Sequence, residues 1–171
     1  MHAAELLNQL REAELPIASA WFTYEAAVHW LILSVRQGWH DTLGIDSAEL
    51  VQRVAAVAFT GKASVNAPKV LLVEDDVDIT NLDEIVWAFA TRSHPERGEF
   101  HFPNKLSDQL AIYLSPEEQH SFKAGKVIYN CLLADLFPKD KRPVKGSFEN
   151  GWPSDIQQRV LTRWTDTYGY R

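Results

Sequence analysis

The stretch that decides the fold is KVLLVEDDVDITNLDEIVWAFATRSHP, from Lys69 to Pro95. It begins with an apolar run, Val70 to Val73, that is short, rich in β-branched residues and followed at once by acidic residues, as is typical of a buried strand. Asn81 can then cap a helix, and Glu84, three residues later, completes the pattern of a capping box. The residue before a proline is kept out of the helical region, so the helix should end near the end of the stretch. The sequence therefore predicts a buried strand, an acidic turn and a capped helix.

Similar signals on both sides of this stretch predict further strands and helices. They indicate a helix at 3–14, strands at 17–22 and 28–35, a helix that starts after Asp46 and ends at Gly61, a short apolar alternation at 99–102, and a final helix that starts at Ser154 with Gln157 as its capping-box partner. The apolar faces expected to be buried are Leu82, Ile85, Val86, Phe89 and Ala90 in the helix of the stretch, and Ile156, Val160, Leu161 and Trp164 in the last helix.

Three segments give no clear periodicity. Residues 126–133 fit either a strand or a helix. Residues 103–125, with an exposed loop at 115–120, and residues 137–151 are expected to be irregular. Strands that alternate with helices predict an α/β fold, with a central mixed sheet flanked by helices in a single layered domain over residues 1–171.

Composition narrows the class of protein. At 171 residues the chain has the usual size of one domain, and 46% hydrophobic with 23% charged residues is ordinary for a globular protein. A net charge of −6 and a pI near 5.5, without a basic stripe, argue against nucleic-acid binding. The lone cysteine fits a reducing compartment, and no run approaches 18 apolar residues. We therefore expect a cytoplasmic protein with no membrane partner.

The order of several motifs resembles the C-terminal domain of the UbiD family of decarboxylases, which use prenylated FMN. The acidic run Asp75–Ile79 leads into the helix segment Val86–Arg92, and Pro95 and Arg97 follow. The family has a DDVDV-like strand end, a helix reading roughly VxWAxxTR, then a proline and an arginine. Further pieces that match in order are WFTYEAAVHWLILSV, FTGKAS, KAGKVIYNCLL and WPSDIQQRVLTRW. The resemblance is nearest the ferulate/phenylacrylate decarboxylase branch and implies a fold like that of the UbiD C-terminal domain.

The turn at residues 60–64 is the best candidate site. Its glycine lets the backbone approach a ligand, and a lysine offers phosphate a point charge with three donors. In the resembled family the matching K-A-G segment lines the flavin pocket and its lysine helps to hold the cofactor phosphate, which implies that Lys62, Ala63 and Ser64 bind the cofactor. The sequence departs from the family pattern twice, because Ser64 replaces the glycine and Val65 replaces the usual aromatic residue. An ordinary loop lysine is an equally weighted alternative.

Other polar groups have structural interpretations that we favour. The acidic residues 74–78 mark a strand end that leads to a helix N-terminus, and they lack the spacing of a metal-binding loop, so no metal site is predicted. Arg92 and Arg97 fit cations at a helix C-terminus, with pairing to Asp75 or Asp78 as the functional alternative. His29, beside a tryptophan in an expected strand, fits a core histidine, and Cys131 fits a buried inert thiol.

The resemblance implies a function but leaves the catalytic residues unassigned. Family decarboxylases need a Glu–Arg–Glu set over the flavin and a metal that bridges its phosphate, and nothing in this sequence matches these groups. We expect a UbiD-like carboxy-lyase C-terminal domain that acts in oligomerisation and in closure of a prenylated-FMN active site for aromatic or α,β-unsaturated acids. By itself the chain is expected neither to bind the flavin tightly nor to decarboxylate.

Two other functions remain open from the sequence. One is a stand-alone, flavin-independent lyase, isomerase or cyclase on a small organic acid, with a pocket lined by the tryptophan and histidine side chains around Trp21 to Trp30. The other is a structural or regulatory partner of a larger UbiD-like subunit. For each we expect a homodimer, since isologous dimers are the commonest assembly, with the aromatic segment Trp164–Tyr170 as a candidate contact.

Overall fold

The computed structural model describes residues 2–137, 141, 143, 146, 148–164, 167 and 169. They fall into two compact units, Met1–Phe137 and Pro138–Arg171, each of which is described by itself. In the described part of the chain, no helix is long and apolar enough to cross a membrane.

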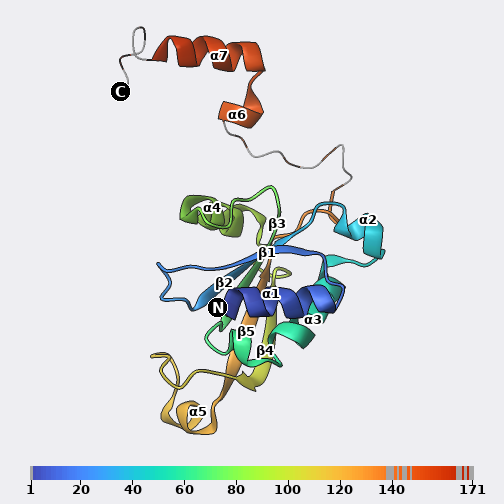
Figure 1. Ribbon diagram of the computed structural model, residues 1–171, viewed down its shortest axis with the longest axis vertical. Coiled ribbons are helices and arrows are strands. Elements are labelled where there is room, and N and C mark those ends of the chain that lie inside the picture. Colours follow the sequence, from blue (N-terminus) through green and yellow to red (C-terminus); the bar gives the residue numbers. More distant parts are fainter. Residues whose placement is uncertain are drawn as a thin grey trace. The chain divides into compact units, whose positions relative to one another are not determined.

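The first unit is built on a five-stranded mixed sheet with the strand order β1-β2-β3-β5-β4 (Figure 1). The strands are β1 (Ile17–Phe22), β2 (Trp30–Val35), β3 (Lys69–Glu74), β4 (Glu99–Leu106) and β5 (Lys123–Asn130). β3 lies at the centre and pairs in parallel with β2 and β5, while the outer strands β1 and β4 pair antiparallel with β2 and β5. The predicted α/β fold with a central mixed sheet is confirmed.

Helices pack on both faces of this sheet. On one face, α1 (His2–Glu12) and α3 (Ser47–Ala58) share an apolar cluster with Val70 and Leu72 of β3. On the other face, α4 (Leu82–Arg92) shares a second cluster with Leu71 and Val73. Successive side chains of a strand point to opposite faces, so burial on both sides explains why β3 is continuously apolar. The short helices α2 (Trp39–Leu43), α5 (Pro116–Ser121) and the 3₁₀ turn η1 (Lys62–Ser64) complete the unit.

The prediction that residues 103–125 are irregular is wrong in three places. β4 continues to Leu106, α5 occupies most of the expected exposed loop, and β5 begins at Lys123. Pro103 is tolerated in β4 because this is an edge strand, whose register shifts between Phe102 and Lys105. α5 carries a capping box between Ser115 and Glu118. Residues 126–133, which fit a strand or a helix, are a strand as far as Asn130.

The capping and the buried face of α4, and the end of α3, also differ from prediction. Asn81 caps α4, but its side chain accepts from the Asp83 N–H, and the Glu84 carboxylate accepts instead from the Asp78 N–H, so the expected capping box does not form. The buried face of α4 is Ile85, Ala88 and Arg92, whereas Val86 and Ala90 are exposed. α3 begins after Asp46 as predicted but ends at Ala58; Gly61 has an extended φ of −93° and precedes η1.

The second unit contains α6 (Phe148–Gly151) and α7 (Ser154–Thr162). α7 begins at Ser154 as predicted, but Gln157 donates from its side chain to the carbonyl of Trp152 instead of completing a capping box. The prediction that α7 buries its apolar face is wrong in the described residues, since Leu161 is 57% exposed and Trp164 is 43% exposed. The prediction that residues 137–151 are irregular is wrong for 148–151, where α6 forms. The rest of this stretch and the expected contact segment Trp164–Tyr170 lie partly outside the described residues.

Candidate functional site

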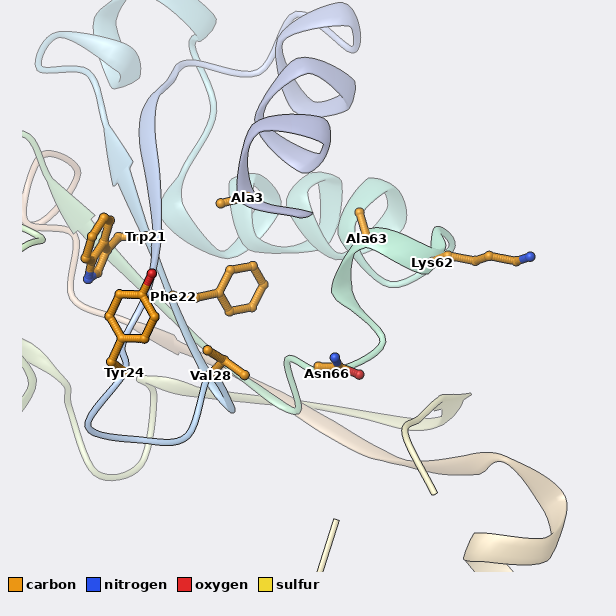
Figure 2. A pocket seen from close by; sticks show the side chains of 8 residues that line it. All are labelled: Ala3, Trp21, Phe22, Tyr24, Val28, Lys62, Ala63 and Asn66. Atoms are coloured by element: carbon orange, nitrogen blue, oxygen red, sulfur yellow. The ribbon is translucent and has the colours of Figure 1, made fainter. Parts of the chain in front are cut away.

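A cavity of about 330 Å³ lies beside the turn η1. It opens between the start of α1, the end of β1, the loop that follows β1, and the turn itself (Figure 2). Its lining residues are Ala3, Trp21, Phe22, Tyr24, Val28, Lys62, Ala63 and Asn66.

The sequence builds the aromatic wall of the cavity from an edge strand. Trp21 and Phe22 are the last residues of β1, and Trp21 makes an edge-to-face contact with Tyr24 at 5.9 Å between ring centroids. Several hydrogen bonds close the loop, among them those from the Thr23 hydroxyl and N–H to the Trp30 carbonyl and from the Val28 N–H to the Thr23 carbonyl. Trp21 and Phe22 pack against apolar clusters on opposite faces of the sheet, so the edge of the sheet presents mostly apolar aromatic side chains in more than one plane.

Two consecutive residues of this loop have left-handed backbones. Ala27 has a φ of 49° and Val28 a φ of 57°. A β-branched residue is rarely found at positive φ, where the strain is of order 1–3 kcal/mol. Such strain tends to occur at functional sites, and here it places a valine on the wall of the cavity.

The three residues predicted to bind a cofactor occupy different positions. Lys62 and Ala63 line the cavity, whereas Ser64 lies fully buried beneath it. Lys62 is exposed, and Figure 2 shows its side chain extending away from the aromatic wall, so that its ammonium lies outside the hollow. The hydroxyl of Ser64 donates a short hydrogen bond to the Ala58 carbonyl at the end of α3. Ser64, which stands where the resembled family has glycine, therefore anchors the turn.

The cavity can bind but has few groups for catalysis. Its walls are apolar and aromatic, with the Tyr24 phenol, the Asn66 amide and the Lys62 ammonium as its polar side chains. Among the lining residues that the structure describes there is neither a carboxylate nor an imidazole. The arrangement suits a flat apolar ligand with an anionic group near Lys62, and its lining offers no carboxylic acid for proton transfer.

The acidic residues at the end of β3 and in the turn after it form hydrogen bonds with other parts of the fold. Glu74 is buried and accepts from the Leu133 N–H, while Asp75 accepts from the Gln37 N–H. Asp76 accepts two hydrogen bonds from the Arg92 guanidinium, at 2.9 and 2.6 Å. In the part of the chain that the structure describes, no group of three or more His, Cys, Asp or Glu side chains is arranged to hold a metal ion.

Arg92 lies in the last turn of α4, as the favoured structural interpretation predicted, but the predicted pairing with Asp75 or Asp78 is wrong. The partner is Asp76 and not Asp75 or Asp78, and the pair is more than a cation at the end of a helix dipole, because the Arg92 side chain is only 4% exposed. The Arg92 guanidinium also lies 5.0 Å from the centre of the Trp87 ring. Arg97, by contrast, is exposed.

His29 and Cys131 lie outside the cavity lining. His29 precedes β2 instead of lying inside it, and its Nδ1 is 2.8 Å from the Ala27 carbonyl oxygen. Cys131 is fully buried as expected, and burial raises the pKa of its thiol to about 12. A thiol with this pKa is neutral near pH 7 and a poor nucleophile.

Sequence reasoning found part of this site. Of the tryptophan and histidine side chains around Trp21 to Trp30 that were expected to line a pocket, Trp21 does so, whereas His29 is not among the described lining residues and Trp30 packs against Phe89 with ring centroids 5.7 Å apart. Phe22 and Tyr24 line the cavity and were not predicted. Asn66 was missed, and its loop position carries no signal that distinguishes it from a turn residue.

Comparison with known proteins points to the same family as the resemblance found in the sequence. Residues 1–131 match the family described as UbiD_C, the 3-octaprenyl-4-hydroxybenzoate carboxy-lyase C-terminal domain. Over 99% of its length the chain is 36% identical to pyrrole-2-carboxylic acid decarboxylase of Pseudomonas aeruginosa and 31% identical to ferulic acid decarboxylase 1 of Saccharomyces cerevisiae. It spans only 34% of the length of each of these relatives.

Solved structures agree at the level of the fold. The UbiD-class enzyme HmfF from Pelotomaculum thermopropionicum, in complex with FMN, matches 85% of the chain with a TM-score of 0.65 and 17% identity. The closed form of vanillic acid decarboxylase from Sedimentibacter hydroxybenzoicus matches 96% of the chain with a TM-score of 0.66 and 16% identity. The chain covers 30% and 32% of these two proteins.

Proposed function

The chain belongs to the UbiD family, of which it is a C-terminal domain, and we propose that it helps to close and assemble the active site of a decarboxylase that uses prenylated FMN. The substrates in this proposal are aromatic or α,β-unsaturated acids. The domain supplies a binding wall and one cation, and it does not supply the acid and base groups of the reaction.

The observation that carries the proposal is the composition of the cavity beside η1. Aromatic side chains and Lys62 line it, and no carboxylate does. Such a wall can cover one side of a flat ring system, and the outward direction of the Lys62 ammonium suits a phosphate held jointly with other segments (Figure 2). When bound, prenylated FMN would supply the chemistry of decarboxylation, while this chain would exclude water and hold part of the cofactor.

Charge explains why we propose weak binding by the chain alone. A phosphate monoester carries about −1.5 to −2 charges near neutral pH. The Lys62 ammonium offsets one of them from an exposed position, so further cations from other segments are needed to hold the phosphate. The proposed cofactor-binding residues of this chain are therefore Lys62 and Ala63 by direct contact and Ser64 by support of the turn.

The alternative is a stand-alone lyase, isomerase or cyclase that works without flavin. The size and apolar walls of the cavity would suit a small organic acid. This alternative is weaker, because the lining residues include neither a carboxylate nor an imidazole that could transfer a proton.

Titration of the chain with FMN, followed by flavin fluorescence, tests the proposal. We expect weak binding that Lys62→Ala reduces about fivefold, since one exposed ion pair contributes about 1 kcal/mol or less. Lys69→Ala is the matched control, because Lys69 is another exposed lysine, at the start of β3. Equal affinity of wild type and Lys62→Ala would contradict the proposed cofactor contact.

Product analysis with prenylated FMN and an aromatic or acrylic acid tests whether this chain catalyses decarboxylation without other segments. We expect no product above the cofactor-only control from the 171-residue chain. Turnover by this chain with flavin would show that it contains its own catalytic groups. Turnover without flavin would support the stand-alone alternative.

A further inference from the structure

We infer that Lys126 is a positioning residue that clamps the turn η1 and thereby fixes where Lys62 is presented. This inference rests on the proposed function for its consequence, but the clamp itself can be measured without a ligand. Lys126 lies on β5 and is only 3% exposed, although lysine is rarely buried to this extent.

Lys126 makes two contacts from its buried position. Its Nζ donates to the Ser64 carbonyl at 2.5 Å and lies 5.2 Å from the centre of the Phe59 ring. No ion pair to Lys126 is present among the residues that the structure describes. Burying a cation without a carboxylate partner costs free energy. These two contacts offset part of that cost.

The turn that Lys126 holds cannot fix its own position. η1 is a three-residue 3₁₀ turn closed by one hydrogen bond, from the Val65 N–H to the Lys62 carbonyl. Isolated turns of this kind are not stable by themselves. The position of η1 therefore depends on tethers to the more rigid elements around it.

Ser64 is the point where these tethers meet. Its carbonyl accepts from Lys126 of β5 and from the Ala67 N–H, and its hydroxyl donates to the Ala58 carbonyl of α3. The turn is thereby connected both to the sheet and to a helix. Lys62 is two residues from this anchor, so loss of the Lys126 tether would free the backbone that carries the Lys62 side chain.

The titration of Lys126 provides a way to detect the clamp by spectroscopy, because the pKa of its amine is shifted. Burial lowers this pKa to about 8, and no neighbouring charge contributes to the shift. The charged or titratable side chains on the elements packed around it are Lys62 on η1; Glu49 and Arg53 on α3; Lys69 and Glu74 on β3; Glu99, His101 and Lys105 on β4; Glu117, Glu118 and His120 on α5; and Lys123 and Tyr129 on β5 itself. None of these is in hydrogen-bond contact with Lys126 in the structure.

An NMR titration of the wild-type chain is the first test. The amide signals of Val65 and Ala67 should shift with a midpoint near pH 8, because the charge on the Lys126 amine strengthens its bond to the Ser64 carbonyl. The Cys131 thiol does not titrate there, because burial raises its pKa to about 12. Amides that do not respond between pH 7 and 9 would overturn the clamp, and this test needs no variant to fold.

Amide hydrogen exchange in Lys126→Met is the second test. Val65 and Ala67 should exchange at least tenfold faster than in wild type, beyond any change at Leu71 and Leu72 in the central strand. Lys126→Arg keeps a charged donor and should restore part of the protection. Lys123→Met is the matched control, because Lys123 is an exposed lysine of the same strand, and it should leave both amides unchanged. Uniform loss of protection across the sheet would instead assign Lys126 a merely structural role.

The FMN titration connects the clamp to function and separates the two proposals. Lys126→Met should weaken FMN binding about as much as Lys62→Ala does, and the double variant should show no further loss, because both act through one contact. An effect of Lys62→Ala without one of Lys126→Met would overturn this inference and leave the proposed function intact. Faster exchange in Lys126→Met without any effect of Lys62→Ala on FMN binding would overturn the proposed function and leave the clamp intact.

Discussion

Lys126 also makes the stability of the fold depend on pH. Its pKa falls from 10.5 to about 8 because burial penalises the charged form. Between these two values the unfolded chain binds more protons than the folded one, so the contribution of Lys126 to stability should rise with pH. We expect wild type to gain about 1–3 kcal/mol relative to Lys126→Met between pH 7.5 and 10, measured by urea unfolding.

The comparison with Lys126→Met isolates this effect from other groups. Cys131 acts in the opposite direction, because its raised pKa makes the folded state retain a proton that the unfolded state loses above pH 9. Its contribution cancels when both proteins contain the same cysteine. A difference in unfolding free energy that stays constant or falls with pH would show that burial does not lower the pKa of Lys126 in the folded state.

The ion pair of Asp76 and Arg92 gives a second prediction for a single residue. The Arg92 side chain is 4% exposed and Asp76 is 39% exposed, so removing the carboxylate leaves a guanidinium buried without its main partner. We expect Asp76→Asn to lower the free energy of unfolding by about 1–3 kcal/mol, less than for a fully buried pair because Asp76 is partly exposed to solvent.

The neighbouring carboxylate is the control for this pair. Asp75 accepts one hydrogen bond, from the exposed Gln37 N–H at 3.3 Å, so Asp75→Asn should change the free energy of unfolding by less than about 0.5 kcal/mol. Urea denaturation measures both variants. Equal effects of the two substitutions would mean that the general loss of negative charge, and not the Arg92 contact, decides stability.

At the scale of single residues, the sequence indicated candidate residues but not the contacts that they make. The glycine and lysine of residues 60–64 indicated a ligand-binding turn, and Lys62 does line a cavity. The partner of Arg92 was not predictable, because the turn after β3 decides which of three close carboxylates faces α4. Lys126 was not singled out because its burial arises from β3, β4 and α3 together, which are far apart in the sequence.

The loop between β1 and β2 offers a test at the scale of an element. Val28 has a φ of 57°, where a β-branched residue is strained and glycine is not. Because the relief of strain exceeds the entropy lost with glycine, we expect Val28→Gly to raise the free energy of unfolding by about 0.5–1 kcal/mol. Thermal unfolding should show the corresponding rise in melting temperature.

An exposed valine of a helix provides the contrast for this loop. Val86 lies in α4 and is 49% exposed, so Val86→Gly should lower the free energy of unfolding by up to about 1 kcal/mol through loss of helix propensity. The two substitutions are chemically identical and differ only in backbone conformation. Destabilisation of similar size in both variants would show that the loop does not store strain at Val28.

Elements with a strong local pattern were predicted, and elements set by distant contacts were not. β3 and α3 have continuous or regularly spaced apolar residues, and their predicted starts agree with the structure within one residue. β4 was predicted only in its first half, because its second half contains a proline and a shifted register that only pairing with β5 supports. α5 is short, exposes most of its surface, and so has no apolar period that a sequence could display.

At the scale of the whole molecule, the two units have different apolar surfaces. The first unit buries two clusters against its sheet, whereas Leu161 and Trp164 of the second unit are largely exposed. Exposed large apolar side chains on a helix are typical of a surface that packs against another chain or domain. This exposure supports our proposal that residues from 154 onward contribute to assembly, alongside the proposed closure of the active site.

Light scattering of the chain at increasing concentration tests this assembly. We propose a homodimer that would bury the Trp164 ring, and Trp164→Glu should raise its dissociation constant at least tenfold, because the new charge would have to be desolvated in the interface. Ile112→Glu is the matched control, since Ile112 is 99% exposed on the loop before α5 and makes no proposed contact. A wild-type chain that stays monomeric would exclude the homodimer and favour assembly with a larger UbiD-like subunit. Dissociation by Ile112→Glu and not by Trp164→Glu would keep the dimer and move its interface to the segment between β4 and β5.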